Sequence, residues 1–468
     1  MPIKHKKIKQ SSRSRSARSV PNEKSTNESG FNATLDLRMD SMAFGGKAVS
    51  RLDGKVYFVE GGIEGDVATV EITNSNERYG EGRVAKLLEP SPHRGVSACD
   101  VSEQCGGCQW QGVPYPQQMI WKKQFVETSM RRIAKLGEDL VVEPMPSPVA
   151  NGYRNRIMVR GRIFPDGQLK VGYFQRASRE FVGIASCAIA VDRINNFIRC
   201  IQKISFKESQ LARESPALVK FKIEIQDLPA KKSSEPHLLM SIFDTDDKNF
   251  SADIIRKKLA QLPEVAWCGG QADVPKAPFF EFESDLNVTF HTAPGMFQQV
   301  NVPHNHTVRR LVKSAVDEFS PKRILDLFCG SGNLSLPLAD GNRLIEGIEF
   351  SKKAIAAAIY NVEHSGIKKA HYSAGDTEKF LWNASNLKIP YDLIIADPPR
   401  DGMFKSLEPI LNIRPDHILY VSCDPTTLAR DLAVLCKEHY VVKRFVALDF
   451  FPNTYHIESF VVLERAKK

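Results

Sequence analysis

The chain has 468 residues, more than one hydrophobic core usually serves, so two or three domains are expected. Its 42% hydrophobic and 25% charged content is ordinary for a globular protein, and no apolar stretch approaches the ~20 residues of a membrane span. The formal net charge is +9. No apolar core follows the basic N-terminus, so we expect no secretory signal and a cytoplasmic location.

Residues 1–30 are predicted to form a disordered basic tail. They hold eight lysines and arginines against two glutamates, and they contain almost no large apolar side chain to bury. Such an arm commonly contacts nucleic acid, and a solvated tail without a specific role is the alternative.

Residues 31–94 are predicted to form a small β-barrel. Four segments are rich in alternating or β-branched residues, at 35–39, 56–59, 67–73 and 82–88, and glycine pairs separate them at short intervals. Four or five short strands at this spacing are typical of an OB-like barrel, a fold that often binds RNA.

Residues 95–290 are predicted to form a mixed α+β domain. An amphipathic helix is expected at 117–135, followed by antiparallel strands at 157–164, 169–174, 221–226 and 238–243. The stretches 205–215 and 231–236 are expected to be surface insertions.

This domain opens with a cluster of cysteines. Cys99, Cys105 and Cys108 have the spacing C-x5-C-x2-C, and Cys187 lies well downstream. Without an export signal, metal ligation is favoured over disulfides. Zinc ribbons usually have two C-x2-C pairs and this chain has one, so the spacing favours an iron–sulfur centre over zinc, with zinc as the alternative.

Residues 291–468 are predicted to form a doubly wound, mostly parallel α/β sheet. Strands are expected at 323–327, 344–349, 391–397, 417–421, 441–448 and 459–464, with helices between them. Ligands of such sheets bind beyond the carboxyl ends of the strands, and the motifs of this region fall there.

A glycine-rich turn, Asp326-Leu327-Phe328-Cys329-Gly330-Ser331-Gly332-Asn333, follows the first of these strands and is expected to open a helix. Glu349 ends the next strand, where an acid can accept bonds from a ribose. Asp376 ends the segment that follows and is a candidate for an adenine edge. Since the loop lacks the full G-x-G-x-x-G pattern, these acids favour S-adenosylmethionine over a dinucleotide.

Asp397-Pro398-Pro399-Arg400 closes the fourth strand and is expected to present the Asp397 carboxylate outward. Such a turn also occurs in enzymes that methylate amino nitrogens, so alone it leaves an N-methyltransferase open. Cys423, at the end of the following strand, argues against that reading.

Cys423 and Glu458 are the candidate nucleophile and base. A pyrimidine C5 attacks a sulfonium methyl poorly until a thiolate adds to C6, and a base must then remove the C5 proton. Either Arg400 or Arg430 is expected to stabilise the thiolate, and His456 competes with Glu458 for the role of base. An inert buried cysteine is the alternative for Cys423.

These motifs resemble the RNA 5-methyluridine methyltransferases, in particular the bacterial 23S ribosomal RNA (RumA/RlmD-like) branch, over essentially all the chain after residue 30. The resemblance implies a TRAM domain for the barrel, a class I methyltransferase fold for residues 291–468, and a [4Fe–4S] cluster on Cys99, Cys105, Cys108 and Cys187. It also implies that Phe297-Gln298-Gln299-Val300-Asn301 is the family's F-x-Q-V-N motif.

By the same resemblance, six residues contact S-adenosylmethionine or the target base: Gln299, Phe328, Asn333, Glu349, Asp376 and Asp397. Cys423 and Glu458 align with the nucleophile and the base. Asp424 stands where the family usually has Asn in S-C-N-P.

The implied function is methylation of C5 of a uridine in RNA, with ribosomal RNA favoured over transfer RNA and no membrane or obligate protein partner. The alternatives are an exocyclic N-methyltransferase that uses the Asp397 turn and a non-catalytic iron–sulfur protein that binds RNA.

Overall fold

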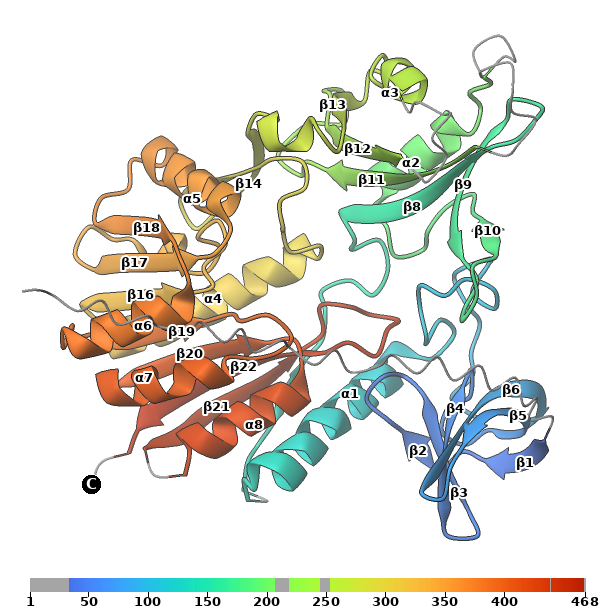
Figure 1. Cartoon of the computed structure of the whole chain (residues 1–468), viewed down its shortest axis with the longest axis horizontal. Helices are drawn as coiled ribbons and strands as arrows, with labels where there is room; N and C mark the ends of the chain where they lie inside the picture. Colours follow the sequence, from blue (N-terminus) through green and yellow to red (C-terminus); the bar gives the residue numbers. More distant parts are fainter. Residues whose placement is uncertain (1–32, 138, 207–218, 245–252, 438, 467–468) are drawn as a thin grey trace, which may run out of the picture.

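The computed structural model describes residues 33–137, 139–206, 219–244, 253–437 and 439–466. The predicted basic tail and most of the predicted insertion at 205–215 lie outside these residues. The described chain folds around three large sheets, which Figure 1 shows as the blue N-terminal barrel, the green central sheet and the orange-to-red C-terminal sheet. Among the described helices, none has the length and apolar content needed to cross a membrane.

The N-terminal sheet has six strands in the order β1-β5-β6-β4-β3-β2, two more than the four segments recognised in the sequence. The strands are β1 (Thr34–Arg38), β2 (Ser41–Met42), β3 (Ala48–Leu52), β4 (Lys55–Glu60), β5 (Val67–Ser75) and β6 (Tyr79–Glu89). Asp53 and Gly54 both have positive φ, which is the geometry of a two-residue hairpin turn, and they join β3 to β4.

The barrel docks on the helix that follows it. This helix, α1 (Tyr115–Ser129), ends in a π-helical turn, η1 (Met130–Ala134), close to the predicted span. The buried side chains of Trp110, Trp121 and Phe125 complete the barrel core. Barrel and helix therefore share one hydrophobic cluster, which fixes their relative position.

The central sheet has the order β10-β9-β8-β11-β12-β13, antiparallel except for its last pair. Its strands are β8 (Arg156–Ile163), β9 (Leu169–Phe174), β10 (Phe181–Gly183), β11 (Val219–Asp227), β12 (Leu238–Asp244) and β13 (Val265–Gly270). Apolar side chains of one face pack against α2 (Asp192–Ile201) and α3 (Asp253–Leu259). The 3-10 turn η3 (Val274–Lys276) and the hairpin of β14 (Phe280–Asp285) and β15 (Val288–Thr292) lead to the C-terminal sheet.

The C-terminal sheet has eight strands in the order β18-β17-β16-β19-β20-β22-β21-β7. Its strands are β16 (Arg323–Leu327), β17 (Leu344–Glu349), β18 (Ala370–Ala374), β19 (Leu393–Ala396), β20 (His417–Ser422), β21 (Tyr440–Leu448), β22 (Glu458–Arg465) and β7 (Glu143–Met145). All neighbours run parallel except β22, which is antiparallel to both of its partners. The predicted doubly wound sheet is confirmed with its six expected strands. The edge strand β18 was missed, and β7 extends the sheet with residues from well before position 291.

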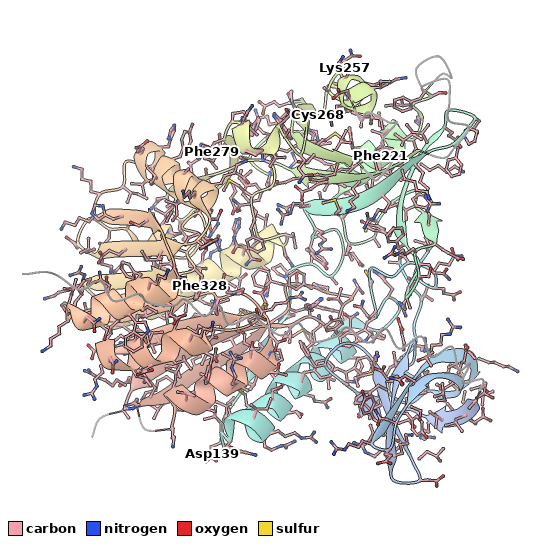
Figure 2. All side chains as sticks on the ribbon, in the orientation of Figure 1. Asp139, Phe221, Lys257, Cys268, Phe279 and Phe328 are labelled. Carbon is pink, nitrogen blue, oxygen red and sulfur yellow. The ribbon has the colours of Figure 1, made fainter. Side chains whose placement is uncertain are left out.

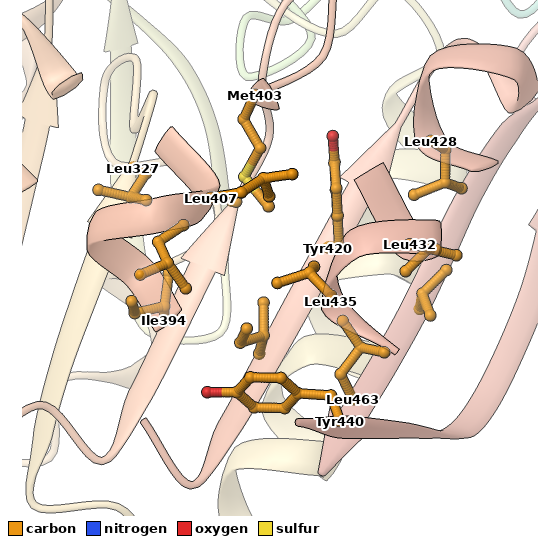
Figure 3. Close-up of a cluster of buried hydrophobic side chains, with 14 of the residues drawn as sticks. Leu327, Ile394, Met403, Leu407, Tyr420, Leu428, Leu432, Leu435, Tyr440 and Leu463 are labelled. Carbon is orange, nitrogen blue, oxygen red and sulfur yellow. The ribbon is translucent and has the colours of Figure 1, made fainter. Parts of the chain in front are cut away.

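Helices cover both faces of this sheet. They are α4 (Val302–Phe319), α5 (Lys352–His364), α6 (Thr377–Asn386), α7 (Leu407–Ile413) and α8 (Pro425–Leu435), with short 3-10 turns η4 (Leu336–Leu338) and η5 (Phe404–Ser406). Alternate strand residues face opposite sides: Leu327 and Tyr420 pack with α6, α7 and α8 (Figure 3), whereas Leu419 packs with α4 and α5. The sheet is thus buried on both faces, which leaves its strand ends as the place where a ligand can bind.

Candidate active site

The predicted nucleophile and base lie at neighbouring strand ends: Cys423 directly follows β20, and Glu458 begins β22. Ser422, the last residue of β20, pairs with Ser459 of the antiparallel β22. One position further along this register, Cys423 stands opposite Glu458, the first residue of β22. Because β22 runs against β20, its start lies at the carboxyl edge of the parallel strands. The sheet therefore brings together two residues that are well separated in the sequence.

The carboxylates of Asp326, Asp397 and Glu458 gather at this edge with raised pKa values. Burial, followed by the charge of Asp397, raises the pKa of Glu458 to about 8. Burial and Glu349 raise the pKa of Asp397 to about 7, and burial with Asp397 and Glu349 raises the pKa of Asp326 to about 8. Such a cluster is costly unless a positive charge neutralises it, so it favours a cationic ligand.

The Cys423 thiol is half-buried behind the same acids. Burial, then Glu458 and Asp397, raise its pKa to about 11, while Arg400 acts in the opposite direction. Of the two arginines considered from the sequence, Arg400 is thus the one that favours the thiolate. Arg430 instead pairs with Asp431 at 2.8 Å and donates to the Asp401 carbonyl.

His456 is a weaker base than Glu458 in this environment. Burial and the charges of Arg400 and Lys122 lower its pKa to about 4. Its ring packs against Tyr455 and Phe451, with centroids 4.1 and 5.7 Å apart. Since Glu458 holds a proton more tightly, the geometry and the pKa order both favour Glu458 for proton abstraction.

The glycine-rich turn is shaped by three residues in the left-handed region. Phe328, Gly330 and Gly332 have φ values of 60°, 55° and 82°. Phe328 is labelled in Figure 2 and follows β16 directly. The Glu349 carboxylate accepts from Gly330 N–H at 3.4 Å and from Ser351 N–H at 2.8 Å, so the turn and the acid are held together.

The helix expected after this turn is not present. The chain passes instead into η4, a single 3-10 turn that contains Pro337. The left-handed Gly332 and the proline interrupt regular α-helical hydrogen bonding, so the prediction was wrong in this detail. The backbone N–H groups of the turn consequently do not form an ordinary helix N-terminus.

The other predicted cofactor residues occupy different environments. The Asn333 carboxamide is held by α4, through Asn305 at 2.9 Å and Arg309 at 2.6 Å. Asp376 is exposed and caps α6 by accepting from Lys379 N–H at 3.0 Å. Gln299 is half-buried in the segment that leads into α4.

Asp326 is a functional candidate that the sequence reasoning left out of the site. It is 1% exposed, and the hydroxyl of Ser335 donates to it. A charged residue in the middle of the buried strand Arg323-Ile324-Leu325-Asp326-Leu327 is unusual, and that signal was available in the sequence.

The four predicted metal ligands converge from two parts of the chain. Cys105 pairs by a backbone bridge with Gln175, and Gly106 N–H donates to the Phe174 carbonyl at 3.0 Å, so the cysteine segment lies against the end of β9. Burial raises the pKa of the Cys105 and Cys108 thiols, and the neighbouring thiols of Cys187 and Cys99 raise it further. None of the four is in a disulfide.

These thiols suit a soft metal, although they are not arranged around one. As placed, no three Cys, His, Asp or Glu side chains in the described ranges are close enough to ligate a common ion. Arg176 Nε is nevertheless buried without a hydrogen-bond partner, and the charge of Arg176 lowers the pKa of the Cys105 thiol. Four thiols beside an unpaired, charged N–H donor fit a negatively charged thiolate cluster.

The open face of the central sheet carries cations stacked on aromatic rings. Arg160 lies 4.5 Å from the ring centre of Phe174, and Arg162 lies 4.3 Å from that of Phe181. Lys170 and Lys222 are their neighbours across the strands. Alternating cations and rings on one face are typical of surfaces that bind single-stranded nucleic acid.

This basic face continues toward the active site. Arg156, on the same side of β8, donates to the Met296 carbonyl at 2.6 Å and lies 5.9 Å from the ring centre of Phe297. Phe297 is 73% exposed and begins the predicted F-x-Q-V-N segment. At the end of that segment, Asn301 donates to the Phe450 carbonyl near Glu458.

Two family models match the chain. The model described as tRNA (Uracil-5-)-methyltransferase matches residues 283–466, and the TRAM domain model matches residues 34–85. The first covers every residue of the carboxyl edge described above, and the second covers most of the N-terminal barrel.

Curated relatives match over nearly the full length. A 23S rRNA (uracil(1939)-C(5))-methyltransferase RlmD from Marinomonas sp. is 31% identical over 92% of this chain and 95% of its own. An uncharacterized RNA methyltransferase from Thermosynechococcus vestitus is 30% identical over 92% of this chain and 98% of its own.

Among solved structures, a Pyrococcus abyssi tRNA (uracil-54, C5)-methyltransferase in complex with S-adenosyl-L-homocysteine has the same fold. It superimposes with a TM-score of 0.64 at 22% identity, covering 92% of this chain and 100% of that one.

Proposed function

The chain belongs to the family of S-adenosylmethionine-dependent RNA uracil-C5 methyltransferases, and from that premise we propose that it methylates a uridine of 23S ribosomal RNA through a covalent bond to Cys423. The observation that carries this proposal is the register of β20 and β22, which sets Cys423 opposite Glu458. An N-methyltransferase would have no use for that pair, and a non-catalytic protein would not need the acidic edge.

The Cys423 thiolate adds to C6 of the uracil, and the electron pair of the C5–C6 bond moves toward the C4 carbonyl as an enolate. Arg400 favours the thiolate that starts this step. C5 then forms its bond to the methyl group, which S-adenosylmethionine supplies as an electrophile on a cationic sulfur. S-adenosylhomocysteine leaves with the electron pair of the broken S–C bond.

Glu458 then removes the proton from C5. The released electron pair re-forms the C5–C6 double bond as the C6–S bond breaks, which frees 5-methyluridine and returns the Cys423 thiolate. The raised pKa of Glu458 makes it a strong base once ionised. The acid cluster of Asp326, Glu349 and Asp397 supports binding of the cationic donor.

Of the predicted cofactor residues, we assign Phe328, Glu349 and Asp397 to the donor pocket. Phe328 belongs to the glycine-rich turn, Glu349 accepts a hydrogen bond from that turn, and Asp397 belongs to the acidic edge. Asp376 follows β18, the strand beside β17, and fits the adenine side of the donor. Asn333, at the end of the turn, is held by Asn305 and Arg309 of α4, and we assign Gln299, in the segment before α4, to the target base.

We propose that Cys99, Cys105, Cys108 and Cys187 hold a [4Fe–4S] cluster. Their mutual electrostatic effect and the unpaired N–H group of Arg176 beside Cys105 support this assignment. A cluster held by these four residues would stabilise the cysteine segment against β9, and it would take no part in the chemistry, because methyl transfer moves no net electrons. Iron, sulfide and zinc measured on the anaerobically purified protein, with Cys105→Ser as the comparison, distinguish this cluster from a zinc site.

The central test uses RNA that contains 5-fluorouridine. Fluorine at C5 cannot leave as a proton does, so the protein should remain attached to the RNA and migrate as a denaturant-resistant complex. Peptide mapping should place the bond at Cys423, and Cys423→Ala should form no complex and no 5-methyluridine. A complex attached elsewhere, or full turnover by Cys423→Ala, would reject the mechanism.

The choice of ribosomal RNA rests on the RlmD relatives. Transcripts of 23S ribosomal RNA and of transfer RNA, offered together with labelled donor, separate the two. Incorporation into the transfer RNA alone would reject the ribosomal assignment and leave the chemistry intact.

A further inference from the structure

The segment between β21 and β22, residues 449–457, carries the chain to Glu458, and we call it the base loop. It forms no regular strand, yet several of its polar residues are buried, among them Asp449 at 0% and Asn453 at 7% exposure. A buried irregular loop needs partners for its polar groups. Two of the partners, Gln118 and Lys122, lie on α1, which is far away in the sequence.

Gln118 of α1 forms two hydrogen bonds with the base loop at Asn453. Its amide oxygen accepts from Asn453 N–H at 2.7 Å, and its amide nitrogen donates to Asn453 Oδ1 at 3.2 Å. Gln118 is itself 1% exposed and also donates to the Val113 carbonyl at 2.9 Å. Both ends of this carboxamide are therefore committed within the protein.

Asn453 has a backbone conformation that needs such support. Its φ is +67°, in the left-handed region that Asn adopts more readily than most residues. Its side-chain N–H group donates to the Ala150 carbonyl and to Asn151 Oδ1, and its carbonyl accepts from Trp110 N–H at 3.1 Å. Every polar group of Asn453 is thus tied to the segments around α1.

Lys122, one helical turn beyond Gln118, holds the start of the same loop. Its Nζ donates to Asp449 Oδ1 at 2.7 Å and to the Phe451 carbonyl at 3.0 Å. Both charged side chains are fully buried. A buried ion pair often stabilises a fold less than apolar residues of the same size would, so its presence points to a requirement for geometry.

We propose that Gln118 and Lys122 are positioning residues for the general base. They fix the path of the base loop so that Glu458 begins β22 opposite Cys423. Helix α1 already packs through apolar residues such as Trp121 and Val126, so the hydrogen bonds of Gln118 and Lys122 are not needed merely to dock the helix. This inference rests on the proposed function, because it assigns Glu458 the removal of the C5 proton.

The proposal predicts which step fails. Cys423 bonds to C6, and C5 receives the methyl group, before Glu458 acts. Misplacing Glu458 should therefore leave formation of the methylated covalent complex nearly unchanged and slow its resolution. A shift of about 1 Å in a catalytic group can cost on the order of 100-fold in rate.

The test compares two neighbouring glutamines of α1. Gln118→Met keeps a similar side-chain volume and removes the hydrogen bonds, whereas Gln117→Met makes the same change on a half-buried position one residue earlier. Single turnovers with RNA and methyl-labelled donor are quenched in denaturant, and the covalent complex and the free methylated RNA are counted separately. Gln118→Met should accumulate labelled complex and release RNA roughly 10- to 100-fold more slowly, while Gln117→Met should match the unmodified protein.

Two further variants guard against simple unfolding. Asn453→Gly permits the left-handed backbone but removes the side-chain bonds, and Lys122→Met combined with Asp449→Leu replaces the ion pair without leaving a lone buried charge. Both should show the same accumulation at a temperature where melting curves report a folded protein. Equal slowing of both steps, or no slowing of release, would overturn the positioning role. If the unmodified protein never forms a covalent complex, the proposed function fails instead.

Discussion

The acidic edge of the C-terminal sheet and the basic face of the central sheet solve opposite electrostatic problems. At the edge, burial and neighbouring carboxylates raise the pKa of Asp326, Asp397 and Glu458, so a single positive charge is strongly favoured. On the central sheet, Arg160 and Arg162 remain partly exposed and lie over aromatic rings. Burial thus suits one compact cation, whereas exposure suits a flexible polyanion.

The largest expected effect comes from replacing the proposed general base of the acidic edge, Glu458, by a neutral residue. Glu458→Gln should lower turnover roughly 100- to 10,000-fold, because a general base contributes about that factor. The labelled covalent complex should accumulate at the same time, since bond formation by Cys423 does not need Glu458. The measurement is steady-state 5-methyluridine formation beside the denaturant-resistant complex. Loss of both signals together would assign Glu458 a role in the first step.

The basic face should respond through RNA affinity and leave the chemistry unchanged. Replacing Arg160 and Arg162 by alanine should weaken RNA binding, and the dependence of log affinity on log salt should become shallower by roughly 0.7 for each phosphate that is no longer neutralised. Single-turnover rates at saturating RNA should stay near those of the unmodified protein. An unchanged salt slope would mean that the cations serve only to cover Phe174 and Phe181.

A smaller effect is expected in the thermal stabilisation of the protein by S-adenosylmethionine compared with S-adenosylhomocysteine. The buried acids have pKa values raised above those of an unfolded chain, so ionising them destabilises the fold as pH rises from about 4 toward 8. S-adenosylmethionine carries a positive charge on its sulfur and S-adenosylhomocysteine does not. The excess thermal stabilisation by the methyl donor should therefore grow as pH rises through the raised pKa values of about 7 and 8.

Asp397→Asn is the control for this comparison, because it removes one of the ionising groups at nearly constant shape. In this variant, the extra thermal stabilisation by S-adenosylmethionine should increase less steeply with pH. A difference between the two ligands that stays constant across the pH range would mean that the acids do not sense the sulfonium charge.

The smallest expected effect concerns residues 1–30, which lie outside the described part of the chain. Their deletion should modestly weaken RNA binding and flatten its salt dependence, because the segment carries eight basic residues. Titrations at two salt concentrations measure both quantities. An unchanged slope would make this segment a bystander.

The features that the sequence predicted are those with local signals. Six of the eight strands of the C-terminal sheet, the order of the motifs at its carboxyl edge and the barrel all follow from short apolar periods and glycine spacing, and the structure confirms them. Cys423 and Glu458 were chosen from motifs, and their roles stay predictions. The identity of the arginine near the thiol needed coordinates, since the sequence does not say whether Arg400 or Arg430 lies closer to Cys423 in the fold.

The features that escaped prediction depend on distant partners. Gln118 and Asn453 are 335 positions apart, and Lys122 and Asp449 are 327 apart. No periodicity in either segment indicates such a pair. β7 joins the C-terminal sheet from a similar distance, and its three residues are too few to give a strand pattern of their own.

The position of β22 has a consequence for synthesis of the protein. This strand is the last one described, yet it lies inside the sheet, between β20 and β21. While a ribosome still holds residues 458–465 in its exit tunnel, β20 and β21 have no strand between them and Cys423 has no partner. A nascent chain therefore cannot acquire a working catalytic centre early, and the newly made enzyme becomes competent only after this segment has emerged.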